Sequence, residues 1–157
     1  MGTVSEAMLQ AMPALKLIQS EGVGYQGFDL AAAKRRGIPV CNNRGINDTA
    51  VAEQTLLLML GCLKNARNLD TAVRAGRQIE AKKACFGKLR ELSECTVGLI
   101  GFGDIARKTA GFLKPFGAHV LVANRTQYPQ LEAEYSVVFT DLDTLLAESD
   151  IVSLHLT

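Results

Sequence analysis

The stretch Thr96-Val97-Gly98-Leu99-Ile100-Gly101-Phe102-Gly103-Asp104-Ile105-Ala106 decides the fold of this chain. Its first five residues are mostly apolar and β-branched, which predicts a buried strand. The pattern GxGxxA follows over residues 101–106 and opens a helix that is expected at 107–114. A second strand is expected at 119–123. A glycine turn between a strand and a helix, with a second strand beyond, is typical of a dinucleotide-binding βαβ unit.

Each small residue of this pattern has a physical role. Gly101 permits the tight turn, Gly103 lets the backbone approach a pyrophosphate, and Ala106 lets the helix pack closely on the strand. The N–H groups that begin the helix point at the phosphates, and the helix dipole favours their negative charge. The alternative is a glycine-bearing turn that holds no ligand. The residues predicted to bind cofactor in this turn are Gly101, Phe102, Gly103, Asp104 and Ile105.

The end of the second strand distinguishes the two nicotinamide cofactors. An acid that binds the ribose is expected about 20 residues after the motif, but this chain has Asn124, Arg125 and Thr126 there. Asn124 would not repel a 2′-phosphate, Arg125 could pair with it, and Thr126 could donate a hydrogen bond to it. The sequence therefore predicts NADP as the preferred cofactor, with NAD as the alternative.

The remaining segments also alternate between helices and strands, which predicts an α/β fold with parallel sheets. A helix from residue 50 to about 66 is apolar on nearly all faces and is expected to be buried between two layers. The polar stretch 64–94 is expected to be a solvated connector. The other expected elements are helices at 5–12, 30–36 and 141–147, the second of them capped by Asp29 and Gly37, and strands at 15–18, 38–41, 137–139 and 151–154.

Composition excludes several classes of protein. The 157 residues are 48% hydrophobic and 21% charged with a net charge of +1, which is globular and neither disordered nor a basic nucleic-acid arm. The longest apolar run, 56–63, is far shorter than the roughly 20 residues that span a bilayer. No secretory signal is visible, so a cytoplasmic protein without a nucleic-acid or membrane partner is expected. The four cysteines are too dispersed for a metal site, and none is predicted.

Four segments together resemble the D-isomer-specific 2-hydroxyacid dehydrogenase family. They are Gly22-Val23-Gly24-Tyr25-Gln26-Gly27-Phe28-Asp29-Leu30, Asn43-Arg44-Gly45-Ile46-Asn47-Asp48-Thr49-Ala50-Val51-Ala52-Glu53, the glycine motif at 96–106, and Ser149-Asp150-Ile151-Val152-Ser153-Leu154-His155-Leu156-Thr157. The resemblance implies a Rossmann-type doubly wound parallel sheet, here incomplete, preceded by part of a flavodoxin-like substrate domain. Residues 1–47 would then be the last part of the first substrate-domain segment. Residues 48–157 would be the interdomain helix, the connector and the first part of the NAD(P)-binding domain.

The resemblance also implies the activity and further site residues. The activity is reduction of a small 2-oxo acid, or oxidation of the 2-hydroxy acid, by hydride transfer with NAD(P), in a homodimer. Gly22, Val23 and Gly24 would hold the substrate carboxylate, and a glycine-rich backbone can form such an anion nest. Thr49 would lie beside the cofactor, and His155 and Leu156 would line its cleft. A Trp that is common in the connector is absent, and Phe86 is expected to pack in its place.

No catalytic residue is assigned, because the Arg, His and acidic residues that the family uses would follow residue 157. His119 has no carboxylate at a spacing typical of a general base. His155 belongs to the segment at the end of a strand and not to the family's catalytic His motif, so the chain alone is expected to be inactive. It is also expected to associate through exposed strand edges. The alternative is a non-catalytic dinucleotide-binding fragment or decayed remnant. A methyltransferase with the same glycine turn is disfavoured, since it usually needs an acid at the position of Asn124.

Overall fold

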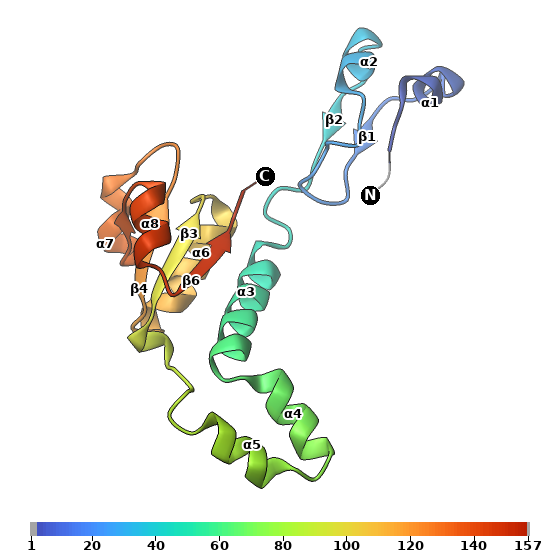
Figure 1. Cartoon of the computed structure of the whole chain (residues 1–157). Coiled ribbons are helices and arrows are strands. Elements are labelled where there is room, and N and C mark those ends of the chain that lie inside the picture. The colour runs from blue at the N-terminus through green and yellow to red at the C-terminus, as the bar shows by residue number, and fades with distance from the viewer. Residues whose placement is uncertain (1–2, 157) are drawn as a thin grey trace. The chain divides into compact units, whose positions relative to one another are not determined.

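The computed structural model describes residues 3–156, which form two compact units (Figure 1). The first unit ends at Asn47, and the second runs from Asp48 to Leu156. Each unit has a hydrophobic core of its own, so the two are described separately. None of the helices among the described residues is long and apolar enough to cross a membrane.

The first unit is a small parallel βαβ arrangement, as the sequence predicts. Its strands β1 (Ile18–Gln19) and β2 (Val40–Cys41) pair in parallel. Both are shorter than expected, and β1 shares only Ile18 with the strand predicted at 15–18. Helix α1 (Glu6–Ala11) precedes them and α2 (Leu30–Arg35) connects them. The Asp29 carboxylate accepts a 2.8 Å hydrogen bond from the first turn of α2, which confirms the predicted cap. The core of this unit consists of Leu9, Ile18, Ala32, Ala33 and Ile38.

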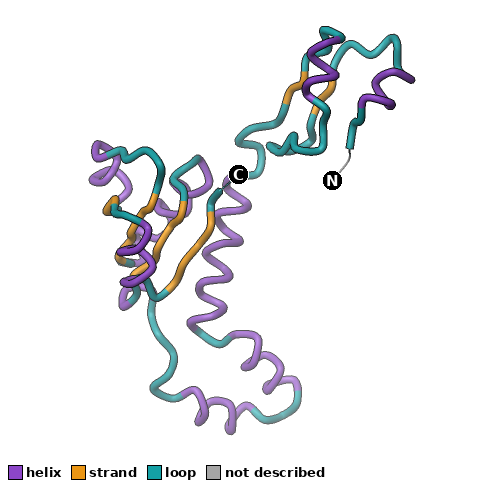
Figure 2. Tube along the Cα trace, turned by 45° about the horizontal axis from the view of Figure 1, so that its top comes forward, coloured by secondary structure: helices purple, strands orange, loops and turns teal. Residues whose placement is uncertain are grey.

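The second unit is built on a four-stranded parallel sheet with the order β5-β4-β3-β6 (Figures 1 and 2). Strands β3 (Thr96–Ile100), β4 (His119–Ala123) and β6 (Ile151–Leu154) have the predicted bounds, and β5 (Val138–Phe139) is one residue shorter. In chain order this is 3-2-1-4, the arrangement of the first four strands of a Rossmann sheet. The predicted fold class is therefore confirmed for this unit.

The crossover helices differ from the prediction at two places. Helix α6 (Asp104–Leu113) begins three residues earlier than expected, because Gly103 takes the extended conformation of an N-cap directly after the turn. It continues into a short 3₁₀ turn, η2 (Lys114–Phe116). Before β5, the 3₁₀ turn η3 (Pro129–Leu131) and helix α7 (Glu132–Tyr135) form where no helix is predicted. Helix α8 (Leu142–Glu148) is capped by Asp141, the residue at which this helix was expected to begin.

Successive residues of β3 face opposite sides of the sheet, and a different group of helices packs on each side. Val97 and Leu99 belong to the larger core, which contains residues of α6 and of helix α3 (Asp48–Leu63). Gly98 faces the opposite way, toward Leu145 of α8. The glycine motif therefore begins at the end of a strand that is covered on both faces, as parallel strands normally are.

Helix α3 is less buried than its composition predicts. It packs one face against α6 and contributes Met59 to the core. Leu57 and Leu58, however, are 61% and 59% exposed. The prediction that this helix is buried on most sides is wrong within its own unit, because only Asp48, Ala52 and Met59 are buried and the main packing partner is α6. Apolar composition alone does not show which leucines find a partner.

The connector is solvated, as predicted. Helices α4 (Ala66–Arg74) and α5 (Gln78–Cys85) contain no buried residue. A 3₁₀ turn, η1 (Leu92–Glu94), then leads to β3. The expectation that Phe86 packs in place of a tryptophan is wrong, because its side chain is 85% exposed. It lies beyond the last turn of α5, where the unit provides no apolar surface to cover it.

An ion pair fixes the end of the connector to the sheet. Arg90 Nη1 lies 2.5 Å from the Asp150 carboxylate, which also accepts a 2.9 Å hydrogen bond from the backbone N–H of Thr96. The Arg90 hydrogen bond and then the Thr96 N–H lower the pKa of Asp150 below its ordinary value, because both favour the charged carboxylate. Asp150 thus joins the connector to the starts of β3 and β6.

Candidate dinucleotide site

The turn after β3 requires glycine at position 101. Gly101 has φ +94°, a conformation that residues with a Cβ rarely adopt. Its N–H donates a 2.8 Å hydrogen bond to the carbonyl of Ala123, which fixes the turn to the end of β4. A Cβ at this position would lie 2.5 Å from the carbonyl oxygen of His155. The turn is therefore enclosed by the carboxyl ends of β4 and β6, the strands on either side.

The next glycine, Gly103, borders open space. A Cβ built there would meet no atom within 4 Å, and Gly103 is the N-cap of α6. Among residues 3–156, no side chain makes a capping hydrogen bond at this end of the helix. A ten-residue helix whose first turn is uncapped and faces open space can accept an anionic group. The geometry at Gly101 and Gly103 thus fits a pyrophosphate.

Asn124 has a positioning role that the sequence did not reveal. Its Oδ1 accepts a 3.3 Å hydrogen bond from the N–H of Phe102, and its Nδ2 donates a 2.6 Å hydrogen bond to the carbonyl of Thr126. One side chain therefore connects the glycine turn to the loop after β4. Arg125 and Thr126 are exposed at this loop.

A cluster of aromatic side chains lies beneath the turn. The Phe102 ring is buried and meets Phe139 and Tyr135 edge to face, with ring centroids 5.2 and 5.7 Å apart. Tyr128, at the end of the loop that begins with Asn124, packs against Phe139 in the same manner at 6.4 Å. Such contacts stabilise by about 0.5–1.5 kcal/mol each beyond burial. This cluster could not be predicted from the sequence, because its members are spread along the chain and none has a motif spacing.

His155 and Leu156 lie at the glycine turn, next to Gly101. His155 donates its backbone N–H to the carbonyl of Ile100 at 2.8 Å, and its Nε2 lies 3.1 Å from the Ser153 hydroxyl. Leu156 Cδ2 lies 3.1 Å from the Cβ position of Gly101. Burial lowers the pKa of His155, because it penalises the charged ring. Burial therefore favours the neutral form of this imidazole.

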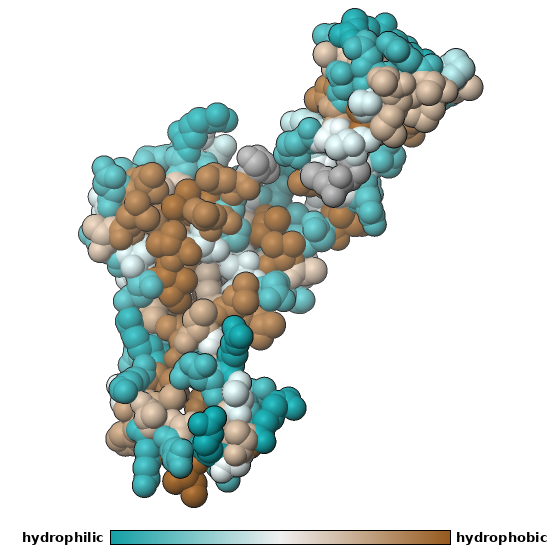
Figure 3. All heavy atoms as spheres, turned by 45° about the vertical axis from the view of Figure 1, so that its right-hand side comes forward, coloured by the Kyte–Doolittle hydropathy of each residue, from teal (hydrophilic) through white to brown (hydrophobic). Residues whose placement is uncertain are grey.

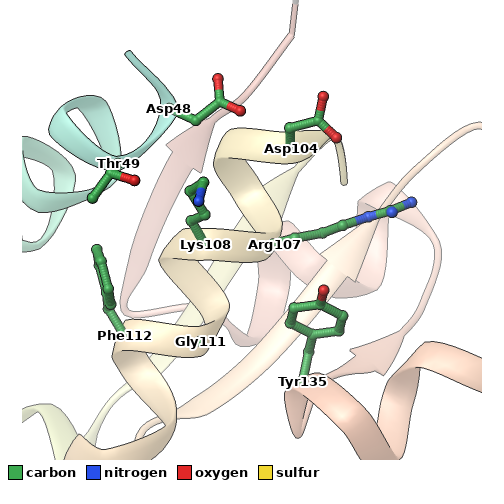
Figure 4. Close-up of a pocket in the computed structure, with 8 residues that line it drawn as sticks. All are labelled: Asp48, Thr49, Asp104, Arg107, Lys108, Gly111, Phe112 and Tyr135. Atoms are coloured by element: carbon green, nitrogen blue, oxygen red, sulfur yellow. The ribbon is translucent and has the colours of Figure 1, made fainter. Parts of the chain in front are cut away.

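Thr49 lies on the first turn of α3, beside α6, and lines an open pocket of ≈ 680 Å³ (Figure 4). Asp104 of the glycine turn lines the same pocket. Both are predicted cofactor residues, but the other predicted residues of the turn and of the Asn124 loop do not line it. The complete lining is Asp48, Thr49, Asp104, Arg107, Lys108, Gly111, Phe112 and Tyr135.

The predicted substrate loop belongs to the first unit, where its carbonyl groups are held in place. The carbonyl of Gly22 accepts a 3.1 Å hydrogen bond from the N–H of Asn43. Asn42 Nδ2 donates to the carbonyl of Val23 at 2.9 Å, and the Ser20 hydroxyl donates to that of Gly24 at 2.7 Å. The N–H groups of these three loop residues have no acceptor among residues 3–156. Such a loop presents donors to an anion such as a carboxylate.

The sequence of this chain matches the profile of a known protein family. The sequence profile described as "D-isomer specific 2-hydroxyacid dehydrogenase, NAD binding domain" matches residues 56–157, about two thirds of the chain. The chain belongs to the D-isomer-specific 2-hydroxyacid dehydrogenase family. The resemblance inferred from the sequence segments is thereby confirmed.

Characterised members of this 2-hydroxyacid dehydrogenase family match nearly the whole chain. The glyoxylate reductase of Thermococcus litoralis is 35% identical over 97% of the chain, and the hydroxypyruvate reductase of Thermotoga maritima is 36% identical over 97%. The chain covers 47% of the length of each. The D-lactate dehydrogenase of Aquifex aeolicus, solved with NAD and lactic acid, superposes with a TM-score of 0.82 at 33% identity. That match covers 98% of this chain and 45% of the dehydrogenase.

Proposed function

We propose that this chain forms the cofactor-binding part of a dehydrogenase that reduces a small 2-oxo acid with NADPH. In that reaction the bound cofactor supplies a hydride to the carbonyl carbon, and an acid supplies a proton to the oxygen. The glycine turn and the uncapped start of α6 support dinucleotide binding. The family membership and the relatives, a glyoxylate and a hydroxypyruvate reductase, support the substrate class.

The preference for NADP rests on one observation, the loop that ends β4. Asn124 occupies the position where a ribose-binding acid is expected, and it uses both ends of its amide to hold the turn. Next to it, the exposed Arg125 is free of any ion pair with residues 3–156. A 2′-phosphate here would meet a guanidinium and no carboxylate from this loop.

We expect NADPH to bind the 157-residue chain at least about tenfold more tightly than NADH, the effect of one charge-assisted hydrogen bond to a phosphate. Isothermal titration calorimetry with both cofactors measures this ratio. Arg125→Met should bring the two affinities close together, whereas Arg67→Met on α4 should leave the ratio unchanged. Equal or tighter binding of NADH by the unaltered chain would show that the NADP preference is wrong.

The same proposal includes the expectation that these residues by themselves do not turn over a 2-oxo acid. Neither His119 nor His155 has a carboxylate partner among residues 3–156, and the Ser153 hydroxyl is the only hydrogen-bond partner of the His155 ring among them. A general base without an orienting group is poorly suited to proton transfer. This observation also favours the second candidate, a non-catalytic dinucleotide-binding module. NADPH oxidation with glyoxylate or hydroxypyruvate above background would contradict both.

We also propose that the chain forms a homodimer in the cytoplasm. Large apolar side chains are exposed on the second unit (Figure 3), and those on α3 and the connector include Leu57, Leu58, Val73, Ile79 and Phe86. Exposed apolar patches of this kind mark association surfaces.

The four cysteines are free thiols, which suits a reducing compartment such as the cytoplasm. Light scattering should give twice the mass of the chain, and Leu57→Lys with Leu58→Lys should shift it toward the monomer. A monodisperse monomer of the unaltered chain would contradict the dimer.

A further inference from the structure

Arg107 extends from helix α6 to the loop that follows β4. Its Nε donates a 3.3 Å hydrogen bond to the carbonyl of Phe102, the residue whose N–H donates to Asn124. Its Cζ lies 5.6 Å from the centroid of the Tyr128 ring, which belongs to the same loop. Although Arg107 lies seventeen positions before Asn124 in the sequence, the fold places its guanidinium beside the Asn124–Tyr128 loop.

The position of this guanidinium is defined by its surroundings. Besides Tyr128, the Phe102 ring lies beneath it, with 5.8 Å from Cζ to the ring centroid. Two aromatic faces and one backbone acceptor restrict the side chain to a narrow range of rotamers. Figure 4 shows Arg107 extended away from Lys108, which lies on the side of α6 toward Thr49. Arg107 is thus preorganised, so little of its side-chain entropy remains to be lost when it binds a ligand.

The two terminal nitrogens of this guanidinium have no hydrogen-bond acceptor among the described residues. Nη1 and Nη2 of Arg107 make no hydrogen bond or ion pair with any residue from 3 to 156. A half-buried cation fixed by aromatic rings, with its donors unused, is an arrangement suited to an anionic ligand. The nearest predicted anion is the phosphate at the ribose end of the cofactor, because that end lies against the loop after β4.

We propose that Arg107 is a second cation for the 2′-phosphate of NADP and, together with Arg125, determines cofactor specificity. This inference rests on the proposed preference for NADP. Arg125 approaches from the loop, whereas Arg107 approaches from α6 across the aromatic cluster. A phosphate dianion has three oxygens that can accept hydrogen bonds, so two guanidinium groups can bind it at once. The planar fork and the stacked position make Arg107 different from a lysine at the same place.

The test compares two fragments of the cofactor that differ only in the 2′-phosphate, namely 2′,5′-ADP and 5′-ADP, by calorimetry on the 157-residue chain. Arg107→Met is expected to weaken binding of 2′,5′-ADP by about ten- to a hundredfold, the loss of hydrogen bonds to a charged group. Its binding of 5′-ADP should stay within about twofold of that of the unaltered chain. Arg67→Met removes the same charge from an exposed position of α4, outside the residues that line the candidate site, and should change neither affinity.

The outcomes separate this inference from the proposal on which it rests. If the unaltered chain binds both fragments equally, the NADP preference fails and the role of Arg107 fails with it. If Arg125→Met loses the discrimination but Arg107→Met keeps it, only the role of Arg107 is overturned. Equal weakening of both fragments by Arg107→Met would also overturn it, since Arg107 would then contact another part of the nucleotide. If Arg107→Met does not fold, Arg107→Lys replaces it, because this variant keeps the charge but loses the planar fork. Binding of 2′,5′-ADP by Arg107→Lys with the affinity of the unaltered chain would overturn the role of Arg107.

Discussion

Replacement of Gly98 by valine is expected to destabilise the second unit by about 3 kcal/mol or more, the upper range for overpacking a core. A single Cβ at this position would meet Leu145 Cδ2 at 2.5 Å and Leu145 Cγ at 2.8 Å, and would collide with the Ser149 hydroxyl. Leu145 is fully buried, and Gly98 is in the interior of the central strand β3. Because Leu145 is fully buried, its side chain cannot move away without displacing other atoms of the packed layer between α8 and the sheet. The midpoint of urea denaturation, followed by circular dichroism, measures the loss.

Two further variants make this prediction specific. In Gly61→Ala, a helical glycine with no atom within 4 Å of the added Cβ is replaced, and this change should stabilise α3 by about 0.5–1 kcal/mol. The Gly98→Ala variant should regain part of its lost free energy of unfolding when Ser149→Gly is added, because the collision with the Ser149 hydroxyl is then removed. The Ser149 hydroxyl has no hydrogen-bond partner among the described residues, so little is lost with it. A Gly98→Val variant with the denaturation midpoint of the unaltered chain would show that the sheet and α8 pack less tightly than described.

Gly101→Ala is expected to cost at least about 2 kcal/mol and to abolish nucleotide binding. An alanine at φ +94° is strained by about 1–2 kcal/mol. Its Cβ would also lie 2.5 Å from the carbonyl oxygen of His155, a backbone atom. The N–H of His155 is hydrogen-bonded to Ile100, so relief requires the end of β6 to move away from β3. Thermal unfolding and titration with NADPH measure the two effects.

Gly103→Ala should separate those two effects. Gly103 has φ −81°, which alanine adopts easily, and its Cβ would meet nothing within 4 Å. The stability should therefore stay within about 0.5 kcal/mol of that of the unaltered chain. Nucleotide affinity should still fall, because the methyl group would occupy space that a pyrophosphate needs. Undiminished NADPH binding by Gly103→Ala would exclude this turn as the phosphate site.

The nucleotide-binding motif was predictable because its requirements are local. Three of the four strands of the larger sheet have the expected bounds, since short apolar segments between turn residues specify buried parallel strands. Gly101 was predicted to permit a tight turn, and it has a positive φ. Gly103 was predicted to leave room for a phosphate, and it borders open space. The start of α6 was misplaced because an N-cap glycine and a turn glycine look alike in sequence.

Side-chain partners between distant segments could not be predicted. Arg107 could not be distinguished from Lys108 by sequence, yet one stacks on Phe102 and Tyr128 while the other lies toward Thr49. The same holds for the leucines of α3, whose exposure depends on how many elements pack around the helix.

The sequence by itself determined the family, the order of the strands along the chain and the glycine turn, because each depends on residues close together in the chain. Only the tertiary structure decided that Asn124 holds the turn and that the guanidinium of Arg107 lies at the loop after β4. Those contacts exist because parallel strands bring their carboxyl ends to one edge of the sheet, and loops far apart in sequence meet there.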